Sequence, residues 1–198
     1  IISKNSGMRK IVFDVETSNL FQDVGSSNPA DLSISLLAIY DSLEDKYSSF
    51  VESEFPSLWP ILEKADLLIG YNSNHFDIPL LNKYYSGDLT KIKSVDLLEE
   101  IRKVIGRRVR LDQVAQGTLQ TSKSGNGLEA LTWWKNGEVE KVRKYCIDDV
   151  KITKELYDYA LRNGKLMYKE GPAVIEIKLD TSTWENKKEN VLTQSLPF

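Results

Sequence analysis

The amino-terminal third of the chain alternates apolar and polar residues in the pattern of β-strands. Strands are predicted at residues 10–16, 33–41 and 46–52, and a short buried strand is predicted at 67–72. The connections between the first three strands are short, which indicates an antiparallel meander. A helix around residues 58–65 is expected to link this meander to the fourth strand.

Helical spacing of apolar residues dominates the rest of the chain. Helices are predicted at residues 75–85, 96–105, 111–119, 127–134 and 138–162. Residues 165–179 alternate again and turn at Gly171-Pro172, which predicts a terminal β-hairpin. Three antiparallel strands followed by strand–helix units predict an α/β fold with a mixed sheet flanked by helices.

Four segments are expected along the chain. Residues 1–7 precede a methionine and are predicted to be a tag or a disordered leader, and residues 8–165 form the main domain. Residues 166–184 contain the hairpin, and the polar residues 185–198 are expected to form a tail.

Length and composition are those of an ordinary globular protein. The chain has 198 residues, of which 41% are hydrophobic and 28% are charged, and no apolar run is long enough to span a bilayer. The single cysteine, Cys146, has no disulfide partner within the chain, which fits a reducing cytoplasm. A net charge of −3 argues against a protein that coats nucleic acid, but it is compatible with an enzyme that engages phosphate through metal ions.

The first candidate motif is Asp14-Val15-Glu16, within the first predicted strand. Residues two apart point to the same face of a strand, so the two carboxylates are expected side by side. Such a pair beside apolar neighbours is costly to desolvate and favours a bound cation. The alternative is a polar edge strand that faces water.

A second motif runs from Tyr71 to Asp77, with the letters YNSNHFD. It lies at the carboxyl end of a predicted strand, where α/β sheets usually place their chemistry. Asp77 is a candidate ligand here, although an acid in the first turn of a helix is also favoured by the helix dipole alone.

The third motif is Tyr145-Cys146-Ile147-Asp148-Asp149 on the long predicted helix. Tyr145 and Asp149 are four residues apart and share a face that is otherwise apolar. An aspartate on such a face needs a partner, because an unpaired buried carboxylate is expensive. A core tyrosine beside a boundary aspartate is the alternative.

Together, and in this order, the three motifs resemble those of the DEDD superfamily of 3′–5′ exonucleases, and the tyrosine resembles its DEDDy branch. YNSNHFDIPLL is similar to a motif of family B DNA polymerase proofreading domains. Residues 127–160 resemble bacterial exonuclease domains that stand alone or accompany helicases. The resemblance covers about residues 10–165 and implies a ribonuclease H-like fold.

This resemblance implies a site for two divalent cations, Mg²⁺ or Mn²⁺, held by Asp14, Glu16, Asp77 and Asp149, with Asp14 shared by both ions. Tyr145 would orient the attacking water. The implied reaction is removal of nucleoside monophosphates from the 3′ end of single-stranded nucleic acid, with DNA preferred.

Further residues are candidates for holding the substrate. Thr17, Asn72 and Phe76 are expected to contact the terminal nucleotide together with Tyr145, through hydrogen bonds or through stacking of the phenyl ring. A basic cluster and a polar loop supply candidate phosphate contacts, namely Arg107, Arg108, Arg110 and Lys123. A solvated helix end is the alternative for the arginines. The only histidine, His75, is expected in a surface or loop-packing role, and Asp96 is expected to cap a helix.

The carboxyl terminus, Ser195-Leu196-Pro197-Phe198, resembles the end of peptides that bind the bacterial sliding clamp, although Thr193 stands where a glutamine is expected. Clamp binding is therefore a hypothesis that a pull-down with and without residues 193–198 would test.

Three alternatives remain open from sequence. The chain could process RNA 3′ ends, since no residue indicates how the site treats a 2′-hydroxyl. It could be an inactive exonuclease-like module that binds nucleic acid, although all four acids are present. It could also be a structural partner recruited through the hairpin and tail.

Overall fold

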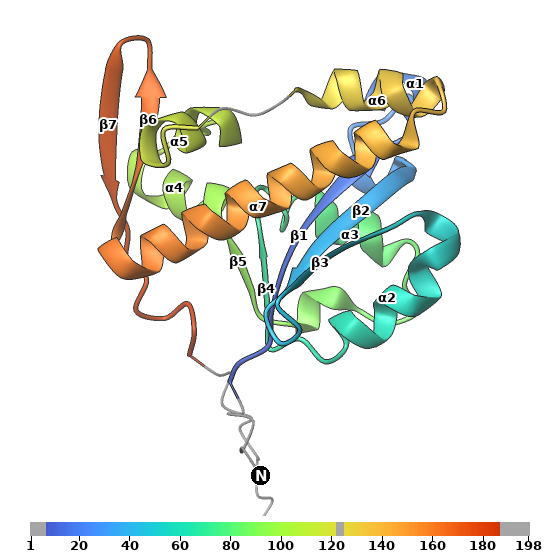
Figure 1. Ribbon diagram of the computed structural model, residues 1–198, viewed down its shortest axis with the longest axis horizontal. Coiled ribbons are helices and arrows are strands. Elements are labelled where there is room, and N and C mark those ends of the chain that lie inside the picture. Colours follow the sequence, from blue (N-terminus) through green and yellow to red (C-terminus); the bar gives the residue numbers. More distant parts are fainter. Residues whose placement is uncertain (1–6, 122–124, 187–198) are drawn as a thin grey trace, which may run out of the picture.

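The computed structural model describes residues 7–121 and 125–186, which fold into a twisted sheet with helices on both faces and a separate hairpin (Figure 1). The strands are β1 (Lys10–Thr17), β2 (Ile34–Asp41), β3 (Lys46–Phe50), β4 (Leu67–Gly70), β5 (Ser94–Asp96), β6 (Lys165–Glu170) and β7 (Ala173–Lys178). The α-helices are α1 (Phe21–Val24), α2 (Phe55–Leu62), α3 (Asp77–Asn82), α4 (Leu97–Ile105), α5 (Leu111–Thr118), α6 (Gly127–Lys135) and α7 (Val139–Asn163). Short 3₁₀ turns lie at Pro29–Asp31, Glu52–Glu54 and Leu89–Lys91.

The main sheet is mixed and has the strand order β3-β2-β1-β4-β5. β1, β2 and β3 form the predicted antiparallel meander, whereas β4 and β5 run parallel to β1. The predicted α/β class, with helices around a mixed sheet and a C-terminal hairpin, is thus confirmed.

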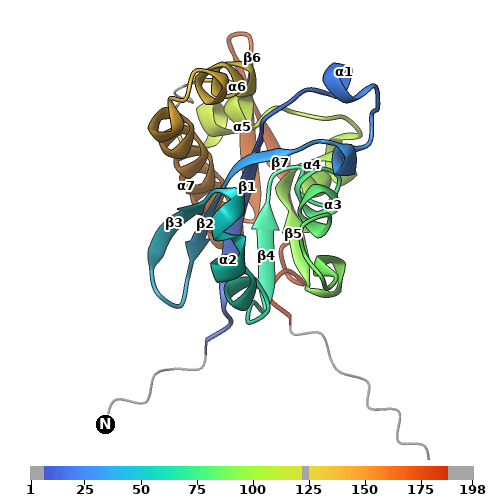
Figure 2. The same ribbon diagram turned by 90° about the vertical axis from the view of Figure 1, so that its right-hand side faces the viewer.

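The alternation along β1 separates two hydrophobic cores. Val12 packs on the face that α7 covers, together with residues of α4, α5 and the hairpin. Phe13 and Val15 pack on the opposite face, against α2 and α3. Figure 2 shows α7 and α3 on opposite sides of the sheet. Side chains of even-numbered β1 residues therefore point toward α7, and this places Asp14 and Glu16 on that face.

Some predicted boundaries are wrong. β5 was not predicted, because its three residues are too few to show alternation. The helix expected at 58–65 is α2, which begins at Phe55 and carries a proline in its first turn. The strand expected at 67–72 ends at Gly70. A Cβ at Gly70 would lie 2.4 Å from the side chain of Ser73, so this tight exit from the sheet needs glycine.

Beyond the hairpin, the described chain returns to the body of the protein. Trp184 is buried and its ring stacks on Tyr157, with centroids 5.5 Å apart. Glu185 forms an ion pair with Lys10 at 2.7 Å. Most of the predicted tail, residues 187–198 with the clamp-like end, lies outside the described residues.

Within residues 7–121 and 125–186, none of the helices combines the length and the apolar character needed to cross a membrane.

Candidate functional site

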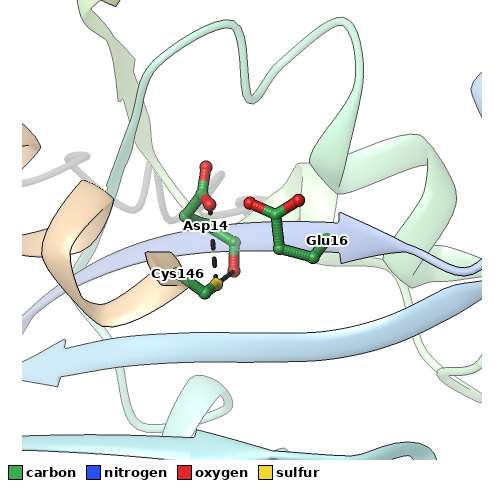
Figure 3. Close-up of side chains that lie close together, drawn as sticks. All are labelled: Asp14, Glu16 and Cys146. Atoms are coloured by element: carbon green, nitrogen blue, oxygen red, sulfur yellow. Dashed lines mark hydrogen bonds between the residues drawn. The ribbon is translucent and has the colours of Figure 1, made fainter. Parts of the chain in front are cut away.

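Asp14 and Glu16 project from the same side of β1, and Cys146 of α7 lies beside them (Figure 3). One ligand atom from each of these three residues lies within 4.8 Å of the others. Their partners on the adjacent strand β2, Ala38 and Leu36, are fully buried, so the two carboxylates have apolar neighbours on that side. Two carboxylates this close oppose each other's ionisation, and a cation between them would relieve that repulsion.

Asp77 joins this pair through the backbone of β1. β4 pairs with β1 only as far as Val12 and Ile69, so the edge of β1 is open beyond that point. There the Oδ1 atom of Asp77 accepts a hydrogen bond from the N–H of Val15 at 3.0 Å. Burial, and then repulsion from Asp14, raise the pKa of the Asp77 carboxyl well above its usual range, although the Val15 N–H opposes the shift.

Helix α7 contributes Cys146 and Asp149. The Cys146 sulfur lies 3.4 Å from the carbonyl oxygen of Asp14 and 3.5 Å from its Oδ2 atom, as a thiol donor to both. Burial, and then the charges of Asp14, Glu16 and Asp149, raise the pKa of this thiol well above its usual range. Asp149 is only 4% exposed, and its charge acts on the Cys146 thiol, so the predicted fourth acid lies close to that thiol.

Tyr145 lies one turn before Asp149 on the same helix. It is 3% exposed, and its ring meets the edge of Trp133 with centroids 6.1 Å apart. Asp148 is turned away instead and pairs with Lys151 at 3.1 Å. The helical spacing therefore separates an inward-facing tyrosine and aspartate from an outward-facing aspartate.

The loop between β4 and α3 is fixed by Asp96. Its carboxylate caps α4 by accepting the N–H groups of Leu98 and Glu99, as predicted, and it also accepts those of Asn72 and Asn74. Burial raises the pKa of Asp96, and these backbone donors oppose the shift. The loop that ends at Asp77 is thereby held against the end of β5.

A sequence model described as the RNase_H superfamily matches residues 11–161, most of the chain. The chain belongs to the RNase_H superfamily. This assignment covers every strand of the main sheet and all three acidic motifs. Membership in this superfamily indicates a nuclease that uses divalent metal ions, and the acidic cluster on β1 is consistent with that chemistry.

Solved structures support the same fold, with 133 matching chains. One is a family B DNA polymerase from the hyperthermophilic archaeon Pyrobaculum calidifontis, with a TM-score of 0.59 and 19% sequence identity. The match covers 78% of this chain but only 24% of the polymerase chain. At this identity the likeness concerns the fold alone. No curated protein sequence matches the chain.

The predicted substrate-contacting residues of this RNase_H chain each contact a different neighbour. Asn72 has a left-handed backbone with φ of 66°, and its side-chain oxygen accepts a hydrogen bond from Arg108 at 2.8 Å. Phe76 immediately precedes Asp77, and its ring is in edge contact with Phe21 of α1. The hydroxyl of Thr17 donates to Asn19, two residues further on.

The basic residues proposed for phosphate binding are not equivalent. Arg107 is occupied by Glu170, at 2.8 Å, and by the hydroxyl of Tyr168. Arg108 donates to Asn72, whereas Arg110 lines a hollow that also touches Tyr145. Lys123 lies outside the described residues. His75 is exposed, in keeping with the predicted surface role.

Sequence reasoning missed two side chains that contact residues of the predicted site. Cys146 was read only as a cysteine without a disulfide partner, although its place between Tyr145 and Asp149 on one helix could have indicated the contact with Asp14. Phe21 reaches Phe76 from a short helix, and it is 37% exposed. The available signal was a pair of adjacent large apolar residues, Leu20 and Phe21, in a segment that is rich in polar residues.

Proposed function

We propose that this RNase_H chain is a 3′–5′ exonuclease of the DEDDy branch that removes nucleoside monophosphates from single-stranded nucleic acid, preferably DNA. The observation that carries the proposal is the convergence of β1, the start of α3 and α7. Asp14 and Glu16 share one face of β1, Asp77 is bonded to the backbone between them, and α7 packs on that face with Asp149 turned inward.

The donor set fits two hard divalent cations. Mg²⁺ and Mn²⁺ prefer carboxylate oxygens, and the four predicted acids would supply them, namely Asp14, Glu16, Asp77 and Asp149. The raised pKa of Asp77 reflects a buried carboxylate held near another without compensating charge. A thiol is a poor ligand for these ions, so Cys146 is better suited to orient Asp14 than to bind metal.

Two bound metal ions would supply an activated water and would stabilise the departing 3′-oxygen. In the proposed hydrolysis, the water oxygen bonds to the terminal phosphorus, the bond from phosphorus to the 3′-oxygen breaks, and that oxygen gains a proton.

The remaining residues of the site would orient the reactants. The Tyr145 hydroxyl would hold the attacking water. Two observations support this role: the ring packs against Trp133, and the same helix carries Asp149. Phe76 would stack on or wedge behind the terminal base, with Phe21 supporting its ring. Asn72 and Thr17 would offer hydrogen bonds to the terminal nucleotide.

The decisive experiment uses single-stranded DNA and RNA labelled at either end. Each is incubated with the protein and Mn²⁺, Mg²⁺ or EDTA, beside the variants Asp14→Ala and Asp148→Ala. Stepwise shortening from the 3′ end that needs metal, disappears in Asp14→Ala and persists in Asp148→Ala would support the proposal. The faster polymer would identify the substrate class.

A folded protein that cleaves neither polymer would overturn the exonuclease proposal and would favour the inactive binding module. Faster shortening of RNA would retain the chemistry and replace DNA as the preferred substrate.

A further inference from the structure

Two hollows in the surface adjoin one another outside the acidic cluster. The first, of about 320 Å³, has Tyr145 in its wall and extends between α5 and the start of α6. The second, of about 630 Å³, lies between the end of α5 and the hairpin. Gln116 of α5 lines both hollows, so they meet at this side chain. Together they are called the depression, with Tyr145 at one end and the hairpin at the other.

The inner hollow begins at the proposed catalytic site. Its wall includes Gly125, where an added Cβ would lie 3.6 Å from the Tyr145 ring and 3.1 Å from Trp133. The backbone thus approaches the two rings closely. Gln116 also lines this hollow, and its amide donates a hydrogen bond to Asp112 at 2.7 Å. Polar groups and an aromatic ring therefore face the same space.

The outer hollow is bounded by a rigidly attached hairpin. The Thr118 hydroxyl donates to the carbonyl of Met167 at 2.7 Å and accepts the Met167 N–H at 2.8 Å. The Gln113 amide donates to the carbonyl of Lys169. Figure 1 shows the hairpin rising beside α5. Its surface in the hollow combines Lys169 with the apolar Pro172 and Val174.

The cationic side chains that line the depression differ from the nearby arginines in the partners that they have. Arg107 is neutralised by Glu170, and Arg108 is held by Asn72. Arg110 on the inner hollow and Lys169 on the outer one form no ion pair with any residue that the structure describes. Unpaired cations spaced along a polar depression suit the phosphates of a nucleic-acid strand.

We propose that this depression holds the single strand upstream of its 3′ end. The strand leaves the acidic site past Tyr145, passes Gln116 and lies against the hairpin, with its phosphates near Arg110 and Lys169. Exposed apolar atoms of Pro172 and Val174 would contact bases without reading their sequence. This inference rests on the proposed function, and it adds a path for the substrate.

Binding is measured first, by fluorescence anisotropy of labelled single-stranded DNA of about 12 nucleotides in EDTA, over a range of salt concentrations. The variants are Arg110→Gln and Lys169→Gln. The matched control is Lys64→Gln, which removes an exposed lysine just beyond α2, the helix on the opposite face of the sheet. Because all three side chains are exposed, thermal melts are expected to match the wild type.

Each depression variant is expected to bind about 3- to 10-fold more weakly and to lower the salt slope by about 1, while the control does neither. Affinity and slope equal to the control in both variants would overturn the proposed path.

A second measurement separates the path from the chemistry. A chromogenic ester of thymidine 5′-monophosphate has one nucleotide and cannot reach the hairpin, so Lys169→Gln is expected to leave its turnover unchanged. Weakened binding in the variants of a protein that cleaves nothing would retain the path and refute the exonuclease proposal. Normal cleavage and binding in both variants would refute the path alone.

Discussion

Asp77 is buried, and burial penalises its negative charge. Its hydrogen bond from the Val15 N–H needs only an oxygen that accepts, with or without a charge. Asp77→Asn keeps an oxygen for the Val15 N–H and removes the charge. Because the charge faces Asp14 in a buried setting, the variant is expected to melt in EDTA at or above the wild-type temperature. Nuclease activity is expected to fall at least about 100-fold, since the proposed metal site would lose one of its ligands.

The same variant tests metal binding without any turnover. Saturating Mn²⁺ stabilises a protein that binds it only when folded, by about 2.7 kcal/mol at a hundred times the dissociation constant. Calorimetry should show a rise in wild-type melting temperature that Asp77→Asn reduces or abolishes. An equal rise in both proteins would show that the ions bind elsewhere.

The hydroxyl and the ring of Tyr145 can be tested separately. Tyr145→Phe keeps the edge contact with Trp133, so the fold is expected to persist. If the hydroxyl orients the attacking water, kcat on a 3′-labelled strand should drop about 10- to 100-fold with a small change in KM. Tyr159→Phe, also on α7, serves as the control. A variant with normal kcat would remove the water-orienting role.

At the scale of elements, α5 and β6 meet at a contact that only glycine permits. A Cβ at Gly117 would lie 2.6 Å from the Tyr168 backbone, which cannot shift without moving the hairpin. Gly117→Ala is therefore expected to lower the free energy of unfolding by about 1–3 kcal/mol in urea titrations. Gly127→Ala in α6 is the matched control, because nothing lies within 4 Å of its Cβ position. That control should be neutral or stabilising by up to about 1 kcal/mol.

If both alanine variants unfolded at the same urea concentration, α5 and the hairpin would have to be loosely joined. If Gly117→Ala lost DNA binding and Gly127→Ala kept it, the result would support the proposal that the DNA strand lies against the hairpin in its present position.

The elements show how far a sequence can predict this molecule. Alternation on β1 was enough to place Asp14 and Glu16 on one face, because the period of a strand is fixed. Helical spacing likewise turned Asp149 inward. The order of β4 and β5 in the sheet, and the Cys146–Asp14 contact across 132 residues, depend on tertiary packing that no local pattern contains.

At the scale of the whole molecule, one hydrophobic core packs on each face of the sheet. A shift of one residue in the register between β1 and β2 would move side chains from one core to the other. Arg9, just before β1, donates to both carboxylate oxygens of Asp41 at the end of β2, and both side chains are largely buried. Burial tends to raise the pKa of Asp41, but the bonds from Arg9 and the N–H of Leu43 outweigh it, so the net shift is downward. This ion pair joins the start of β1 to the end of β2.

A carboxyl whose pKa is lower in the folded state contributes stability above its unfolded pKa, and this stability is lost as the pH falls through the folded value. Asp41→Asn should therefore cost about 2 kcal/mol near pH 7, as expected for a buried hydrogen bond to a charged group. The difference from wild type should shrink below about pH 4, where unfolded aspartate binds its proton. Glu140→Gln removes an exposed pair with Arg143 and should stay close to wild type throughout. Urea titrations at several pH values would measure both, and a gap for Asp41→Asn that stayed constant into acid would mean that the charge of Asp41 does not hold the register.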